Sequence, residues 1–333
     1  MSRSLRRSLL WIGLAVSLLF TYVALRDVDL GVFVDGLAES NYAWLVPSFL
    51  VLAAAVFVRA VRWRLLFAAE RRPPVTNALS ALLVGYLFNN ILPARAGDPI
   101  RALVLHQRTG IARGEALGTV GTERVFDTVC LLFLLFVSLP FLPEVTWVRN
   151  AAILAAAVGA AVLALVLVVA RYDARPIAWL LRPFARLPAI SPADTERAAD
   201  NVVRGLGGFR SPRLAGTAFA VTVASWLIVA VSVWLTTFAF DLEVSFGAAV
   251  LVTIAMNLAL IIPAAPGGVG VFEAAVLAAL AAYGIGASLA LAFAVVLHGL
   301  HFFPYILIGY LVLHRHGARM RQVEHLPAAP SLT

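Results

Sequence analysis

The sequence predicts an all-α polytopic membrane protein, with about six full spans and two broken, re-entrant helical hairpins. Of its 333 residues, 62% are hydrophobic and 13% are charged, whereas a soluble domain is about 45–50% apolar and about 25% charged. Several apolar runs exceed the roughly 18 residues that cross a hydrocarbon core. The cationic residues are all arginine and cluster between these runs. This distribution is typical of membrane-protein loops and argues against a nucleic-acid-binding face.

The first two predicted spans fix the orientation of the N-terminus. Three arginines precede an apolar run at residues 9–25, so we expect a cytoplasmic N-terminus and an uncleaved first span. The acidic segment 26–41 is then outside, and a second span, about 43–67, returns to the cytoplasm. The arginines that we expect at the cytoplasmic end of this span are Arg59, Arg62, Arg64, Arg71 and Arg72.

The next apolar run is interrupted. Residues 78–92 are followed by a proline- and glycine-containing break at 93–97 and a polar stretch, so we interpret this segment as a hairpin on the cytoplasmic side. Spans at 125–142 and 151–170 follow. The segment 171–213 contains eight arginines, so we expect a cytoplasmic loop that lies on anionic lipid.

A second interrupted segment, 248–283, lies between spans at 214–240 and 288–313. The last span is followed by a basic stretch, which predicts a cytoplasmic C-terminus. The second hairpin therefore starts and ends outside, with its break at residues 263–270. The tail 322–333 contains two prolines and is expected to be disordered.

The order of spans and hairpins repeats with opposite orientation. We therefore interpret residues 1–333 as one transmembrane domain that contains an inverted repeat, with halves at 1–148 and 149–316. In hydrocarbon, a broken helix persists only where it faces protein or a wet cavity, because its freed backbone groups need partners. The two breaks are therefore the predicted site.

Three charged residues in the first break are candidates for binding substrate. Arg95 and Arg101 carry guanidinium groups that match a phosphate, or they are ordinary interfacial arginines. Asp98 precedes Pro99 and is expected to be the N-cap of a helix. It is also a candidate for binding substrate.

A second charged group, Glu123, Arg124 and Asp127, opens the predicted span at 125–142. Residues three and four apart share a helix face, so these side chains can act together. They are candidates for binding substrate, and an interfacial ion-pair cluster is the alternative.

The second break contributes glycines and one acid. Gly267, Gly268 and Gly270 would let a headgroup approach the backbone, or would only allow close helix packing. Glu273 lies alone in the apolar stretch 269–280, so its burial needs a partner or a proton.

Few other residues carry a chemical signal. His298 and His301 are weaker candidates for proton transfer or headgroup binding, because such histidines often bond locally. The single cysteine, Cys130, cannot form an intrachain disulfide. The sequence contains no metal-ligand spacing and no nucleotide-binding fingerprint, so we expect no metal and no cofactor.

At the two breaks and the charged group, the chain resembles the transmembrane region of lysylphosphatidylglycerol synthases and the related flippase-like membrane proteins. The motifs lie at residues 90–101, 123–127 and 262–273. The resemblance implies a membrane domain that moves lipids or lipid-linked headgroups between leaflets. In the synthases this domain precedes a cytosolic aminoacyl-transferase domain, which we do not expect after Thr333. The family usually has glutamate at the position of Asp98. Aspartate keeps the charge, but its shorter side chain would reach a different point.

Three functions follow as hypotheses. The leading one is a lipid flippase-like transporter of the cell membrane, not an enzyme, that binds an anionic phospholipid or a polyprenyl-phosphate-linked lipid. The second is a polyprenyl-phosphate-dependent membrane glycosyltransferase, which would use Asp27 and Asp29 in the first external loop. The third is a non-catalytic membrane partner of a lipid or glycan enzyme. An enzyme partner and a homo-oligomer are both left open.

Overall fold

The computed structural model is entirely helical over the residues it describes, which are 3–92, 95–141, 150, 153, 157, 212–262 and 264–324. Four helices in this part of the chain are long and apolar enough to cross a membrane: Tyr42–Leu65, Arg113–Phe141, Arg213–Phe240 and Ala287–Arg315. A bent helix pair at the N-terminus makes a fifth candidate span. The all-α membrane class is therefore confirmed. The predicted span 151–170 and the basic loop 171–213 lie almost entirely outside the described residues.

The N-terminal pair consists of α1 (Arg3–Leu25) and α2 (Leu30–Ala38), bent by 88°. The segment expected as a loop therefore contains a helix. Asp29 is its N-cap, because the carboxylate accepts hydrogen bonds from two backbone N–H groups of the first turn. The backbone N–H of Asp29 also donates to the Ser288 hydroxyl at 2.8 Å, which ties the bend to the start of the last helix.

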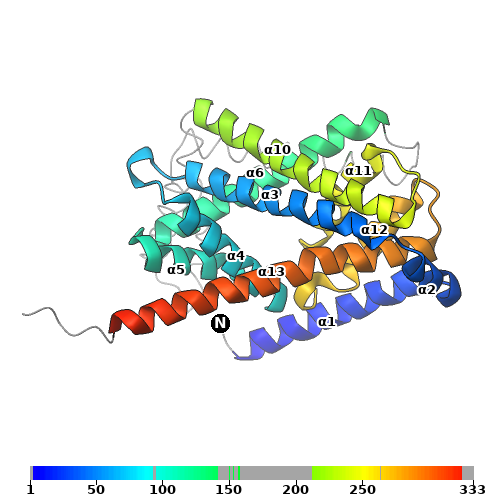
Figure 1. Cartoon of the computed structure of the whole chain (residues 1–333), viewed down its shortest axis with the longest axis horizontal. Helices are drawn as coiled ribbons and strands as arrows, with labels where there is room; N and C mark the ends of the chain where they lie inside the picture. Colours follow the sequence, from blue (N-terminus) through cyan, green and yellow to red (C-terminus); the bar gives the residue numbers. More distant parts are fainter. Residues whose placement is uncertain are drawn as a thin grey trace, which may run out of the picture.

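The helices α3 (Leu45–Leu65) and α10 (Pro212–Thr237) lie side by side along much of their length (Figure 1). The hydroxyl of Ser48 lies 2.9 Å from that of Ser232 and 2.8 Å from that of Thr236. Small polar residues of this kind let membrane helices approach closely and hydrogen-bond across the interface.

The first broken hairpin consists of α4 (Val75–Ile91) and α5 (Gly97–Thr109), and the second of α11 (Phe246–Ala259) and α12 (Val271–Ala281). The two lie toward opposite ends of the long axis, with α5 near one end and α11 near the other (Figure 1). Their breaks meet, because α4 packs against the short helix η7 (Pro266–Gly268) of the second break. Such a meeting of the breaks is what the predicted inverted repeat leads us to expect, and the repeat itself stays a prediction. The half-repeat boundary at 148/149 lies outside the described residues and stays a prediction.

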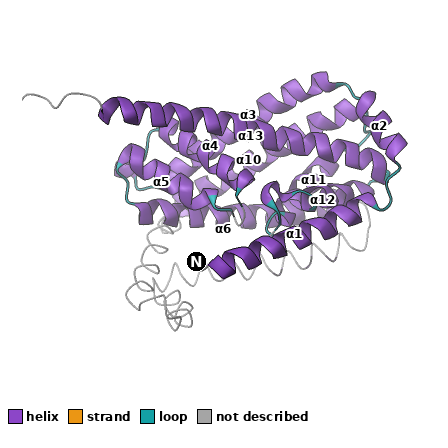
Figure 2. Ribbon diagram, turned by 90° about the horizontal axis from the view of Figure 1, so that it is seen from below, coloured by secondary structure: helices purple, strands orange, loops and turns teal. Residues whose placement is uncertain are grey.

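Helices α6 (Arg113–Ser138) and α13 (Ala287–Glu324) complete the described bundle (Figure 2). The prediction that a span opens at residue 125 was wrong, because α6 begins at Arg113 and places Glu123 well inside the helix. Likewise α13 continues to Glu324, into the tail expected to be disordered. Residues 325–333 lie outside the described part.

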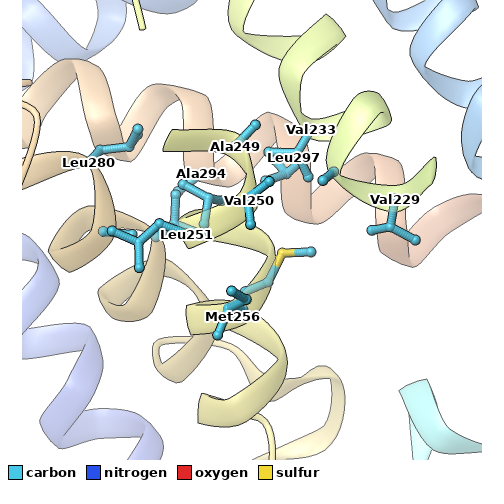
Figure 3. Packing of buried hydrophobic residues seen from close by; sticks show 14 of the residues in the cluster. Val229, Val233, Ala249, Val250, Leu251, Met256, Leu280, Ala294 and Leu297 are labelled. Carbon is cyan, nitrogen blue, oxygen red and sulfur yellow. The ribbon is translucent and has the colours of Figure 1, made fainter. Parts of the chain in front are cut away.

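The largest apolar cluster surrounds the second hairpin. It brings together Val229 and Val233 of α10, Met256 of α11, Leu280 of α12 and Leu297 of α13 (Figure 3). Alanines fill much of the remaining contact area, and several of them are completely buried. In a lipid environment, association depends on such close contacts between small residues. This packing holds the second break in position.

Candidate functional site

Six charged side chains from α3, α5 and α6 form a closed ring in which positive and negative charges alternate. In order around the ring they are Arg62, Glu123, Arg101, Asp98, Arg124 and Asp127. We call this the charge ring. Its formal charge is zero, because three guanidinium groups face three carboxylates.

Arg62 connects α3 to two carboxylates of α6. Its Nη2 lies 2.8 Å from Glu123 Oε1, and its Nη1 donates to Asp127 Oδ1. Nη1 also donates to the Thr222 hydroxyl of α10, at 3.1 Å. The side chain is only 1% exposed. The expectation of an interfacial Arg62 was therefore wrong, because its partners lie on helices remote in sequence.

Arg101 is equally enclosed. Its Nη1 lies 3.0 Å from Glu123 Oε2, and its Nε lies 3.5 Å from Asp98 Oδ1. The guanidinium also lies over the Trp63 ring, 4.9 Å from its centroid, in a cation–π contact. The side chain is 1% exposed and lines neither cavity described below, so Arg101 stabilises the ring and is not available to a phosphate.

Asp98 and Arg124 join the first break to α6. Arg124 donates from Nε to Asp98 Oδ2 at 3.0 Å and from Nη2 to Asp98 Oδ1 at 2.8 Å. Burial raises the pKa of Asp98, but Arg124 and Arg101 outweigh burial and hold the pKa below its usual value. Asp98, in the first turn of α5 and outside the candidate spans, is therefore ionised at neutral pH.

The expectation that Asp98 is an N-cap was wrong. Helix α5 begins at Gly97, and Ala96 occupies the cap position without a capping hydrogen bond. The side chain of Asn89 replaces the cap, because its Oδ1 accepts from the Gly97 N–H at 2.8 Å. A side chain at Gly97 would collide with the backbone oxygen of Gly85, which explains a glycine there.

A cavity of about 420 Å³ lies between the two breaks, and we call it the large lobe. Six of the predicted site residues line it: Arg95, Glu123, Arg124, Asp127, Gly267 and Gly268. The other four, Asp98, Arg101, Gly270 and Glu273, do not. A second cavity of about 130 Å³, the small lobe, shares Arg59 and Trp226 with the large one.

Two arginines of the cavity lining form no ion pair among the described residues. Arg95 donates from Nη2 to the backbone oxygen of Leu260 at 3.2 Å, and its φ of 53° is in the sparsely populated left-handed region. Arg59 donates only to the Tyr86 hydroxyl, at 3.4 Å, and lies 4.2 Å from the centroid of Trp226. The sequence placed Arg59 at the cytoplasmic interface, but it lines both lobes. Because every carboxylate of the large lobe belongs to the ring, the lining has surplus positive charge.

Glu273 has the partner that its burial requires. Its Oε1 pairs with His298 Nδ1, and its Oε2 accepts from the Gly270 N–H at 2.6 Å. His298 Nε2 lies 3.0 Å from the backbone oxygen of Gly267, which can only accept, so Nε2 carries a proton. The pair therefore shares one further proton between Nδ1 and Oε1. The Glu273–His298 pair thus contacts the backbone of the glycine-rich break at Gly267 and at Gly270.

At Gly270 the glycine allows close helix packing, which was the alternative to headgroup binding. Its φ is 85°, and a side chain there would collide with the Ser17 backbone oxygen and the Thr21 hydroxyl of α1. A headgroup therefore has no approach to this backbone. Gly267 and Gly268, in contrast, line the large lobe.

Comparison with known proteins points to a membrane family. The family described as "Lysylphosphatidylglycerol synthase TM region" matches residues 10–309. A UPF0104 membrane protein of Methanothermobacter thermautotrophicus is 25% identical over 74% of this chain and 76% of its own length. A UPF0104 membrane protein of Methanocaldococcus jannaschii is 27% identical over 36% of this chain and 37% of its own. Glycosyltransferase AglD of Haloferax volcanii is 25% identical over 82% of this chain, which spans about half (49%) of AglD.

Proposed function

Because the chain belongs to the family of the lysylphosphatidylglycerol synthase transmembrane region, we propose that this multi-pass integral membrane protein moves the headgroup of an anionic lipid between leaflets. The cell membrane, with both termini in the cytoplasm, is the location that we propose with it. The lipid is an anionic phospholipid or a polyprenyl-phosphate-linked lipid.

The observation that carries the proposal is the surplus positive charge of the cavity between the two breaks. Arg59 and Arg95 face this cavity without carboxylate partners among the described residues. A guanidinium group forms strong, charge-assisted hydrogen bonds to phosphate oxygens. A phosphate in this cavity would therefore find two cationic donors.

The two hairpins suggest how the headgroup gains access from each leaflet. They lie toward opposite ends of the molecule and their breaks meet at the cavity (Figure 1). In transporters with inverted repeats, each half can open a central site toward one side. A cavity of about 420 Å³ accommodates a headgroup, while the acyl chains stay in the surrounding lipid.

Reconstitution into liposomes tests this function. Phosphatidylglycerol with a fluorescent acyl chain is quenched from outside by dithionite, so the rate at which inner-leaflet lipid becomes quenchable measures transport. We expect the protein to raise this rate above that of protein-free liposomes. The variants Arg59→Gln and Arg95→Gln should each lower it roughly tenfold or more, because each loses charged hydrogen bonds to phosphate. A wild-type rate equal to that of protein-free liposomes would contradict transport of this lipid.

Glycosyl transfer is the second candidate, because AglD is a glycosyltransferase by name. The carboxylates expected for it have other partners: Asp29 caps α2, and Asp27 pairs with Arg26 at 3.0 Å. Neither lines a lobe of the cavity. If the protein transfers a glycosyl group, Asp27→Asn should abolish the transferase activity. If it moves lipid, as we propose, the same change should leave the transport rate unchanged. If the protein is instead a non-catalytic partner, Arg59→Gln should change neither glycosyl transfer nor lipid transport.

A further inference from the structure

Three residues that line the small lobe carry buried polar atoms that have no hydrogen-bond partner. They are Arg59 Nε and Nη2, Trp226 Nε1 and His301 Nε2. Buried polar groups in folded proteins are almost always paired, and each unpaired group is costly. Four such atoms on residues that line one cavity indicate a place for a polar ligand.

These atoms include both donors and an acceptor. The Arg59 and Trp226 atoms are N–H donors. His301 Nδ1 lies 3.0 Å from the Leu297 backbone oxygen and must donate to it, so the neutral ring has an acceptor at Nε2. Asn257 uses its Nδ2 on the Thr253 oxygen, which leaves Oδ1 as a second acceptor beside the lobe. Hydroxyl groups both donate and accept, so they match this lining.

Much of the rest of the lining is aromatic, and the lining lacks negative charge. Phe272 stacks on His298 with the ring centroids 4.3 Å apart, and Tyr86 and Tyr305 lie 4.9 Å apart. The residues around the small lobe include no carboxylate. An ammonium group there would be unpaired and close to Arg59, which is strongly unfavourable in a low-dielectric site.

We propose that the small lobe binds an uncharged, hydroxyl-rich group joined to the phosphate that Arg59 and Arg95 hold. This inference rests on the proposed function and gives it a substrate class: a phosphodiester lipid that carries a polyol or a sugar, and not an aminoacylated lipid. The shared chemistry can come from two sources, a glycerophospholipid with a glycerol headgroup or a polyprenyl phosphohexose.

Equilibrium binding to the detergent-solubilised full chain tests the inference. The probes are dioctanoyl phosphatidylglycerol, its lysyl ester, dioctanoyl phosphatidic acid, which has no polyol, and a short polyprenyl phosphohexose. We expect the two polyol lipids to compete roughly threefold to tenfold better than phosphatidic acid, and the lysyl ester to be the weakest. The stronger of the two polyol probes identifies the source. A lysyl ester that binds as well as phosphatidylglycerol would overturn the inference.

Variants separate the polyol from the phosphate. His301→Phe removes the acceptor but keeps an aromatic ring, so it should reduce the affinity for phosphatidylglycerol to that for phosphatidic acid. Trp226→Phe removes one donor and should act in the same direction. The control is His314→Phe, the same change at an exposed position of α13. A polyol preference that survives both lobe variants would contradict the assignment of the lobe.

The two proposals fail separately. If the polyol preference holds but no lipid moves in liposomes, the transport function is wrong and the binding site stands. If lipid moves with no preference for a polyol, transport stands and the small lobe has no such role.

Discussion

Asp98 and Arg124 face each other between α5 and α6 through two nearly parallel hydrogen bonds, 3.0 and 2.8 Å long. This bidentate geometry is the strongest form of an arginine–carboxylate pair. It attaches the first break to the only helix that contributes three members of the charge ring. The pair therefore allows a direct test of what the ring does.

We expect Asp98→Asn to destabilise the protein by about 3–5 kcal/mol, because it removes one of the two carboxylates that Arg101 and Arg124 each contact and leaves the buried ring with one uncompensated positive charge. Thermal unfolding in detergent measures this change. Asp98→Glu keeps the charge and is the matched control, with a smaller loss from the displaced carboxylate. Equal stability of wild type and Asp98→Asn would show that the ring does not hold α5 in place.

The pair of Glu273 and His298 makes a different prediction. Glu273→Gln should retain stability within about 1 kcal/mol, because the amide can donate to His298 Nδ1 and accept from the Gly270 N–H. Glu273→Ala leaves both groups unpaired and should cost about 2–5 kcal/mol. The same unfolding assay compares the two variants. A Gln variant as unstable as the Ala variant would mean that the negative charge itself is required.

Gly270→Ala should loosen the contact between α1 and α12. The added Cβ would meet the Ser17 backbone, and φ at this position is 85°. Overpacking and the left-handed conformation together should cost about 2–5 kcal/mol. Protease accessibility of α1 and the unfolding temperature report the change. Gly286→Ala, where an added Cβ would meet nothing within 4 Å, is the control and should be neutral.

The proposed topology places the segment after α2 outside the cell and the connection between α5 and α6 in the cytoplasm. Single cysteines at the exposed positions Glu39 and Ala112, in a Cys130→Ala background, report it through a membrane-impermeant maleimide. In intact cells we expect label at Glu39→Cys only, and at Ala112→Cys only after permeabilisation. Labelling of both from outside would contradict the predicted orientation.

Hydropathy and arginine placement predicted the span boundaries well wherever the helices are uniformly apolar. They failed at the start of α6, because its first turns contain glycine, threonine and glutamate. These residues are polar in sequence, yet several of them, including Thr119 and Glu123, are buried in the structure. A window average records polarity but does not reveal that the polar side chains face partners on another helix.

Six of the ten predicted site residues line the large lobe, but the sequence did not predict which charged side chains pair. The sequence pointed to the breaks and to the residues from Glu123 to Asp127, whereas it placed Arg59 and Arg62 at the cytoplasmic end of the second span. Their spacing of three residues places both on one face of α3, and this was the available signal. Which carboxylate each arginine meets depends on contacts between α3, α5 and α6, and a single sequence does not contain them. In the same way, the need of Glu273 for a partner was evident, but the identity of His298 as that partner was not.

The two hairpins are anchored with unequal strength. The first is tied to its neighbours by the charge ring, whereas the second depends on one shared-proton pair and on contacts between small apolar residues. Separating the first hairpin exposes several unpaired charges, while separating the second exposes mostly hydrocarbon, for which lipid is a suitable solvent. The side of the cavity formed by the first hairpin is therefore more rigid than the side formed by the second. Under the proposed function, we expect opening past the second hairpin to have a lower barrier than opening past the first, so that opening past the first limits the rate of passage in both directions.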